Sequence, residues 1–489
     1  MERVKPLEDI LGEGGDIDTA LVAVDTPHSL KKTLGPISLT AMGIGAIIGT
    51  GIFVLTGVAS AKYSGPSLTV SFIIAGIVSV FAALCYSEIA SRVPVAGSAY
   101  TFTYASLGER FAWVIGWALV LEYALGAATV SVGWSGYFST LMGHIGWQIP
   151  PALLHNYWDT GPSGEVLHGI LNLPAFLVIC LIGSLLYRGT HESAMVNNII
   201  VTLKVCVVLF FIAIGVGHVN QGNWTPYFPF GWGGTLFGAF FVFFAYIGFD
   251  AVSTAAEESI NPKRDMPIGI MGSLAICTVL YIIVAAILTG IVSYTHLNVP
   301  QPVAYAIDQI PGLGWASALI SVGAIAGLTT VLLVMMFGQI RVFYAMSRDG
   351  LLPPVFSKLH PKFRTPGLST VLFTIFIAII AAFTPISILG SLTNMGTLAA
   401  FILVAIAVPI LRKRYPNTTG FSVPFGNYVI PILSAVSAFA LIVLGPLLST
   451  GIGHIWGIPL PWFGFIVWLL IGLPIYFVYG RSHSKLAGK

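Results

Sequence analysis

Gly43-Ile-Gly-Ala-Ile-Ile-Gly-Thr-Gly-Ile-Phe53 decides how this chain folds, because it places four glycines inside the first long apolar segment. A helix in lipid needs unbroken backbone hydrogen bonding, since the hydrocarbon offers no partner to a bare N–H or C=O. Each glycine weakens a helix by about 0.8–1.0 kcal/mol relative to alanine. The stretch therefore predicts a helix that unwinds at membrane depth. Irregular backbone is tolerated there only where it lines a cavity, so we expect a ligand site at this break.

The composition around this stretch is that of an integral membrane protein. Of the 489 residues, 56% are hydrophobic and 8% are charged, whereas soluble domains carry about 25% charged residues. The polar start lacks the apolar core of a cleavable signal peptide, so residues 1–35 are expected to form a cytoplasmic segment. All four cysteines fall in apolar segments and are interpreted as buried small hydrophobic residues. The sequence predicts no metal site and no cofactor.

Segments of 18 or more mostly apolar residues are long enough to span a bilayer as helices. The sequence predicts twelve such spans, at residues 37–60, 68–92, 99–131, 171–187, 195–218, 233–258, 265–293, 314–345, 367–384, 386–411, 428–450 and 459–480. With the N-terminus inside, all of the 22 lysines and arginines except Lys62 and Lys204 fall on the inner side. The positive-inside rule therefore predicts a multi-pass plasma membrane protein with both termini in the cytoplasm.

A second interrupted segment lies in span 6, at Phe243-Phe-Ala-Tyr-Ile-Gly-Phe-Asp-Ala251. Its single glycine and aspartate are a weaker break signal than the four glycines of span 1. Its position carries the argument, because spans 1 and 6 are corresponding members of two five-span halves. Paired broken helices at such positions indicate a transporter built on inverted repeats.

Four motifs, in order, resemble those of the amino acid–polyamine–organocation superfamily. They are Gly45-Ala-Ile-Ile-Gly-Thr-Gly-Ile-Phe-Val-Leu-Thr-Gly57, Tyr86-Ser-Glu-Ile-Ala-Ser-Arg-Val-Pro-Val-Ala-Gly-Ser-Ala-Tyr100, the Phe244–Pro267 stretch and Ser347-Arg-Asp-Gly-Leu-Leu-Pro353. The third is similar to the cationic amino acid transporter branch. The resemblance covers most of residues 30–415 and implies an all-α leucine-transporter fold, a 5+5 inverted repeat with two extra C-terminal helices. It also implies alternating access and amino acid transport.

The resemblance places the substrate between the two breaks. The carboxylate of an amino acid would meet the backbone amides of Gly49, Thr50 and Gly51, at the positive end of a half-helix. The alternative is that Gly43, Gly45, Gly49 and Gly51 form a small-residue face on which two helices pack closely.

The ammonium would meet backbone carbonyls of both broken spans. By the same resemblance these belong to Ile47, Phe244 and Ile247. Phe244 would also cover the substrate as an aromatic gate. The alternative for Phe244 is plain packing within an aromatic-rich run.

Lys204 lies about ten residues into span 5, which places it near the middle of the bilayer at about 1.5 Å per residue. A charged lysine at a helix centre costs at least about 2.5 kcal/mol, so it needs a partner or a cavity. In proton-coupled members of the family, a span-5 lysine amine replaces a bound cation. The partners expected here are the carbonyls of Gly45 and Ile48, together with the hydroxyl of Thr329 or Thr330. The alternative is a fixed lysine that caps the broken helix and does not exchange a proton.

Three acidic residues complete the candidates. Glu122 in span 3 is expected to pair with a cationic side chain of the substrate or to stay protonated and hydrogen-bonded. Asp250 is expected to cap the second half of span 6. Glu88 stands four residues before Arg92, and fits either an exposed ion pair or part of an inner gate.

These predictions favour a proton-coupled symporter that takes up cationic or small neutral L-amino acids. An exchanger of amino acids or polyamines on the same fold is the main alternative, while a membrane-embedded enzyme or receptor has no supporting motif. The expected partners are an L-amino acid, protons and the lipid bilayer, with no nucleic acid; a small membrane subunit or an oligomer is left open. The predicted divisions are residues 1–35, a transport core at 36–412, two added helices at 413–480 and a cytoplasmic tail at 481–489.

Overall fold

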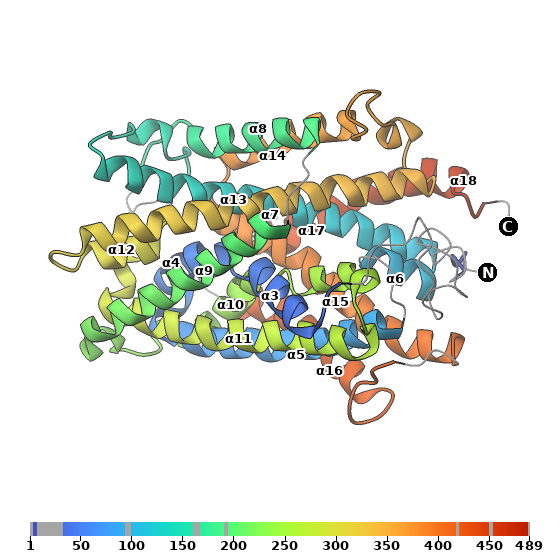
Figure 1. Ribbon diagram of the computed structural model, residues 1–489, viewed down its shortest axis with the longest axis horizontal. Coiled ribbons are helices and arrows are strands. Elements are labelled where there is room, and N and C mark those ends of the chain that lie inside the picture. The colour runs from blue at the N-terminus through green and yellow to red at the C-terminus, as the bar shows by residue number, and fades with distance from the viewer. Residues whose placement is uncertain are drawn as a thin grey trace.

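The computed structural model describes residues 3–6, 33–92, 99–159, 167–189, 194–416, 420–448 and 453–487. Most helices run along the long axis of the molecule, and both chain ends lie at the same end of it (Figure 1). The α-helices and two short strands are α3 Pro36–Ile47, α4 Thr56–Ala59, α5 Leu68–Arg92, α6 Ala99–Ser106, α7 Glu109–His144, α8 Leu173–Arg188, α9 Ala194–Gly215, α10 Gly231–Val242, α11 Pro262–Ile291, α12 Pro302–Asp308, α13 Gly314–Arg348, α14 Gly367–Phe383, α15 Ile386–Arg414, α16 Val429–Leu448, α17 Leu460–Ile475, α18 Arg481–His483, β1 His454–Ile455 and β2 Ile458–Pro459.

The predicted all-α membrane fold is confirmed. Within the described ranges, nine helical runs are long and apolar enough to cross a membrane, and two shorter apolar helices are α8 and α14. The first run, Pro36–Arg92, covers two predicted spans. Each of the twelve predicted spans therefore has a helical counterpart. The strands β1 and β2, each of two residues, pair antiparallel in a short hairpin that the sequence did not predict.

The third predicted span, 99–131, starts where α6 starts, but it misses an interruption after Ser106 and ends too early. The N–H groups of Leu107 and Gly108 both donate to the carbonyl of Thr103, which closes α6 after Ser106. Gly108 then adopts φ +97, a conformation that breaks the helix and that glycine accepts without strain. The long helix α7 starts only at the following residue and continues to His144.

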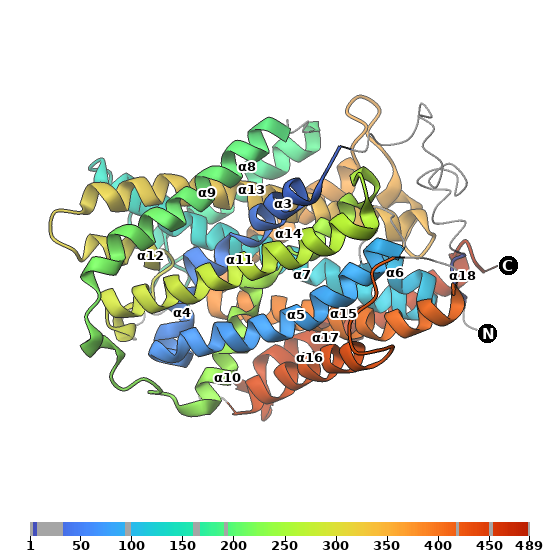
Figure 2. The same cartoon turned by 60° about the horizontal axis from the view of Figure 1, so that its bottom comes forward.

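The two C-terminal spans pack on the outside of the bundle. Helix α16 lies against α10 and α15, and α17 lies against α15 and α7. Helix α16 lies at the lower edge of the molecule in Figure 1 and in Figure 2. The broken first and sixth spans lie further inside.

Some predictions fall partly or wholly outside the described residues. The middle of the second motif, residues 93–98, and most of the predicted N-terminal segment are outside them. All four cysteines are free. The prediction that they are buried holds for Cys85 and Cys277 but is wrong for Cys206, which is exposed on α9, and only partly right for Cys180.

At the end of the molecule that holds both chain ends, residues 3–6 lie on the helix bundle. Lys5 pairs with Asp349, with 3.0 Å between Nζ and Oδ1, and Arg3 pairs with Glu109 at 3.6 Å. Arg3 also donates to the backbone carbonyl of Arg481 at 2.7 Å. The N-terminal residues therefore contact the start of α7, the end of α13 and the C-terminal helix α18.

Glu88 joins α5 to α15 at this end of the molecule. Its side chain is 1% exposed, and its carboxylate accepts from Arg412 on both oxygens and from the backbone N–H of Val423 at 2.9 Å. Arg92 lies 3.0 Å from the same carboxylate. The interpretation of Glu88 as one half of an exposed ion pair is therefore wrong, because the carboxylate is buried between two arginines.

We expect Glu88→Ala to lower stability strongly. Removing one partner of a buried ion pair leaves the other charge uncompensated and costs about 3–5 kcal/mol. Both arginines remain slightly exposed, so the cost should lie near the lower figure, roughly 3 kcal/mol. Thermal unfolding of the detergent-solubilised protein measures it. The control is Asp308→Asn, which breaks an exposed pair with His144 and should change stability by less than about 1 kcal/mol. Equal losses in the two variants would contradict the prediction.

Candidate functional site

The first span breaks where the glycine-rich stretch predicts. Helix α3 ends at Ile47, and Ile48 adopts an extended conformation with φ −70 and ψ 105. After a bend at Gly49, the chain resumes as a π-helical turn over Gly51–Leu55. Several glycines in succession lower the cost of leaving the helix, which is why the break falls here.

The sixth span breaks in a corresponding way. Helix α10 ends at Val242 and passes into a 3-10 turn over Phe243–Tyr246. Ile247 is extended with ψ 133, and Gly248 adopts φ +116, which side chains rarely tolerate. The chain then continues as a 3-10 helix over Asp250–Glu258.

The two breaks approach each other backbone to backbone. A Cβ added at Gly51 would lie 2.2 Å from the Cα of Ala245. A Cβ added at Gly248 would lie 2.7 Å from the carbonyl oxygen of Ala46. Only residues without a side chain allow this approach, so these two glycines hold the unwound parts of spans 1 and 6 together.

The first two glycines of the stretch, Gly43 and Gly45, fit the alternative interpretation, a packing face. Added Cβ atoms would meet Ser273 of α11 from Gly43 at 2.4 Å and Val201 of α9 from Gly45 at 2.3 Å. The motif thus divides: its first half packs against neighbouring helices, and its second half forms the break.

Free polar groups gather at the break in span 1. Thr50 is 1% exposed, and its hydroxyl oxygen has no hydrogen-bond partner among the described residues. The N–H of Gly49 likewise finds no backbone acceptor in the part of the chain that the structure describes. The first N–H groups of a helical segment have no partners of their own within it. The start of the second half-helix therefore presents donors and a hydroxyl.

The carbonyls predicted to bind an ammonium lie at the opposite ends, where the first half-helices stop. The Ile47 carbonyl accepts from the hydroxyl of Tyr281 at 2.8 Å, and the Phe244 carbonyl accepts from the N–H of Ile247 at 3.1 Å. The Phe244 side chain is 3% exposed. Sequence reasoning missed Tyr281; the signal was a single tyrosine in the otherwise apolar middle of span 7.

Lys204 lies in the middle of α9 and is 2% exposed. Its ammonium donates to the carbonyl of Gly45 at 2.9 Å, just before the break. Its stem packs on Gly327 of α13, where an added Cβ would lie 2.9 Å from the lysine Cγ. Sequence reasoning missed Gly327. The lysine thus bridges three helices, α9, α3 and α13.

The other partners expected for Lys204 have different contacts. Thr329 donates to the carbonyl of Ile325 and accepts from the indole N–H of Trp134 at 3.0 Å. Thr330 donates to the carbonyl of Gly327 at 2.8 Å. No hydrogen bond from Lys204 to these hydroxyls or to the Ile48 carbonyl is found among the described residues.

Two carboxylates, one buried and one partly buried, lie near the break in span 6. Glu122 of α7 is 3% exposed, its Oε2 has no partner among the described residues, and it interacts electrostatically with Asp250. Asp250 is the first residue of its 3-10 helix, and its carboxylate accepts from the N–H of Gly248 at 3.2 Å. Asp250 therefore satisfies a donor inside the break. The expectation that it caps the second half of span 6 is wrong, because Phe249 occupies the N-cap position and no described side chain caps this helix.

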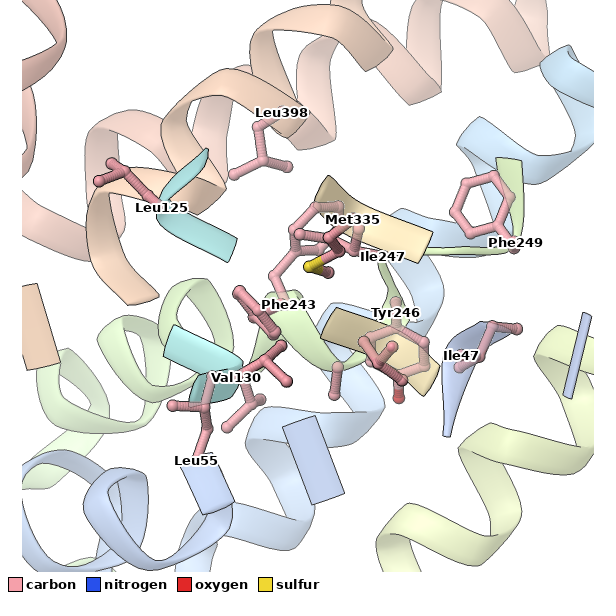
Figure 3. Packing of buried hydrophobic residues seen from close by; sticks show 14 of the residues in the cluster. Ile47, Leu55, Leu125, Val130, Phe243, Tyr246, Ile247, Phe249, Met335 and Leu398 are labelled. Atoms are coloured by element: carbon pink, nitrogen blue, oxygen red, sulfur yellow. The ribbon is translucent and has the colours of Figure 1, made fainter. Parts of the chain in front are cut away.

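Large apolar side chains pack at the two breaks. Figure 3 shows side chains of this cluster, which come from spans 1, 3, 6, 8 and 10. The labelled members include Ile47, Val130, Phe243, Met335 and Leu398. A few free backbone groups within an apolar shell are typical of a small-molecule site.

Comparisons with known proteins identify the family of this chain. Residues 34–483 match the family described as Amino acid permease. The chain is 48% identical over 474 residues to the Branched-chain amino acid permease BcaP of Bacillus subtilis, covering 96% of this chain and 97% of that protein. It is 44% identical over 488 residues to the Methylthioribose transporter of Bacillus subtilis, covering 99% and 98%. It is 35% identical over 454 residues to the human Cationic amino acid transporter 4, covering 90% and 66%. The chain belongs to the amino acid permease family.

Proposed function

We propose that this protein is a secondary transporter that couples the uptake of L-amino acids to the inward movement of protons. The observation that carries the proposal is the close approach of the two broken helices, which brings free N–H groups and carbonyl ends together. The N–H end at Gly49–Gly51 suits a carboxylate, because it is the positive end of a half-helix. The carbonyl end at Ile47 suits an ammonium. Every α-amino acid carries both groups.

Lys204 supports the proton-coupled form of the proposal. Its ammonium ties α9 to the carbonyl of Gly45 in α3, two residues before the first half-helix ends. A neutral amine would hold this carbonyl less firmly than an ammonium, because hydrogen bonds from charged donors are stronger. Protonation would therefore brace span 1, and loss of the proton would free it to move during alternating access.

Uptake by the purified full chain in proteoliposomes tests the proposal. An inside-alkaline pH gradient is expected to drive accumulation of labelled L-alanine or L-arginine above equilibrium, and a protonophore is expected to abolish it. A sodium gradient alone is expected to drive none. Counterflow without net accumulation under the proton gradient would favour an amino acid exchanger instead.

Methylthioribose is the useful negative control in this assay. One relative is named as a methylthioribose transporter, yet that sugar has neither a carboxylate nor an ammonium. A site that combines the N–H end of one half-helix with the carbonyl end of another is expected to favour amino acids over methylthioribose. Competition by methylthioribose as strong as that by L-alanine would contradict the assignment of the two ends.

The substrate side chain is expected to approach Glu122 and Asp250. A cationic side chain would be attracted to both carboxylates, which favours a cationic amino acid such as arginine. Relatives with a branched-chain name leave neutral side chains as the alternative. The backbone groups at the breaks serve both kinds of substrate.

Glu122→Gln separates these two substrates. The substitution keeps the shape of the side chain and removes its charge. A hydrogen bond to a charged group contributes about 1.5–3 kcal/mol, so the KM for L-arginine should rise about tenfold or more. The KM for L-alanine should change by less than about twofold. An equal rise for both substrates would show that Glu122 shapes the site as a whole and does not act on the cationic side chain.

We also propose the orientation with both termini in the cytoplasm. Its support is the concentration of arginines and lysines at the end of the molecule where Arg3 and Arg481 meet. Added cysteines near residue 5 and near residue 485 should react with an impermeant thiol reagent only after the cells are opened.

A further inference from the structure

Tyr281 of α11 connects the two broken helices through one hydroxyl group. Its side chain is 0% exposed. The hydroxyl lies 2.8 Å from the carbonyl oxygen of Ile47 and 3.0 Å from that of Ala245. Ile47 is the last residue of α3, and Ala245 lies in the 3-10 turn that ends the first half of span 6. A single phenolic proton is therefore shared between the carbonyl ends of both breaks.

These two carbonyls are unusual acceptors. The last carbonyls of a helical segment have no N–H partner within it, and they form the negative end of its dipole. Two such ends would repel each other without a donor between them. The hydroxyl of Tyr281 supplies that donor, and it does so at Ile47, the carbonyl to which the proposed function assigns the substrate ammonium.

The ring of Tyr281 is fixed by its neighbours. Its centroid lies 5.5 Å from the ring of Phe72 and 5.7 Å from that of Tyr246. Tyr246 in turn donates its hydroxyl to the carbonyl of Phe72 at 2.7 Å. The three packed rings leave the Tyr281 hydroxyl little freedom to leave the two carbonyls.

We propose that Tyr281 is a positioning residue for recognition of the substrate ammonium. It holds the Ile47 and Ala245 carbonyls at a fixed separation and limits which cation can bind there. A primary ammonium carries three N–H donors and fits a set of convergent carbonyls. The inference rests on the proposed amino acid site and goes beyond it, because it assigns selectivity for the ammonium to a residue in span 7.

The test compares Tyr281→Phe with Tyr246→Phe. Both variants remove one buried phenolic hydroxyl and keep the ring, but only Tyr281 donates to the carbonyls of the breaks. The affinities of purified protein are measured for L-alanine and for L-lactate, which has a hydroxyl in place of the ammonium. Uptake gives KM and Vmax for L-alanine in the same preparations.

We expect Tyr281→Phe to weaken L-alanine binding about tenfold, in keeping with the loss of one hydrogen bond at a charged group, and to leave L-lactate binding unchanged. KM should rise with little change in Vmax. Tyr246→Phe should preserve the preference for alanine over lactate. A general packing defect would instead weaken both ligands together and lower Vmax.

The outcomes separate this inference from the proposed function. If the unaltered protein binds no amino acid, the proposed function fails and the inference falls with it. If it binds L-alanine but the two tyrosine variants behave alike, only the role of Tyr281 is overturned. Should Tyr281→Phe not fold, Phe72→Leu loosens one ring contact and keeps the hydroxyl. The Phe72→Leu variant should then lose part of the preference for L-alanine over L-lactate. An unchanged preference in this variant would overturn the role of Tyr281.

Discussion

Lys204→Met is expected to abolish proton-driven accumulation of amino acids while leaving a folded protein. Methionine preserves an unbranched stem against Gly327, where the lysine Cγ would lie 2.9 Å from an added Cβ. It removes the ammonium that donates to the carbonyl of Gly45. A hydrogen bond from a charged group contributes about 1.5–3 kcal/mol, so we expect uptake to fall at least about tenfold. The measurement is uptake of labelled L-alanine into proteoliposomes under an inside-alkaline gradient.

Counterflow in the same vesicles distinguishes lost coupling from lost binding. Counterflow should persist in Lys204→Met and should no longer depend on pH. The matched control is Lys62→Met. Lys62 lies in the π-helical turn Ser60–Ser64, in the second half of span 1, whereas Lys204 contacts the first half of that span. That control should accumulate substrate like the unaltered protein. Undiminished proton-driven accumulation in Lys204→Met would show that the lysine is only a structural cap of span 1.

Gly51→Ala is expected to inactivate the protein by separating the two breaks. The new Cβ would lie 2.2 Å from the Cα of Ala245 and 2.9 Å from its backbone nitrogen. Backbone atoms cannot rotate away as a side chain can, so spans 1 and 6 must move apart. Overpacking of this kind typically costs about 1–3 kcal/mol, and the displacement changes the distance between the proposed carboxylate and ammonium groups. Affinity for L-alanine should fall about tenfold to a hundredfold.

Two further variants check this explanation. Gly143→Ala, in α7, has no atom within 4 Å of its added Cβ and should bind L-alanine normally. Adding Ala245→Gly to Gly51→Ala removes the clash with the Ala245 Cβ at 2.3 Å, but the clash with the backbone of residue 245 remains. The double variant should therefore remain impaired. Full recovery would show that the side chain, and not the backbone, sets the approach of the two helices.

The sequence predicted much of the fold because most of its signals are local. A span of apolar residues is helical in lipid whatever surrounds it, since the backbone has no other partners there. The breaks at Ile48 and at Gly248 were also predictable, because glycine and the polar Asp250 weaken the helix at those positions. The third span was misplaced because an apolar run does not show that its chain turns at Gly108.

The candidate site was predictable only in part. Its backbone groups follow from the breaks, so Gly49–Gly51 and Ile47 could be named from the motif and the family resemblance. The expected partners of Lys204 could not be settled in the same way. Which hydroxyl or carbonyl meets the ammonium depends on how α9, α3 and α13 are rotated about their axes. Two hydroxyls that were expected beside it, Thr329 and Thr330, bond elsewhere.

The sequence by itself determined that the chain lies in a membrane, that spans 1 and 6 unwind, and that a lysine is buried among apolar residues. The tertiary structure decided which groups meet. Lys204 reaches a carbonyl 159 positions away, and Tyr281 reaches one 234 positions away. The reason is physical: hydrogen bonding along a helix is fixed by neighbours in sequence, whereas contacts between helices depend on side-chain packing across the whole bundle.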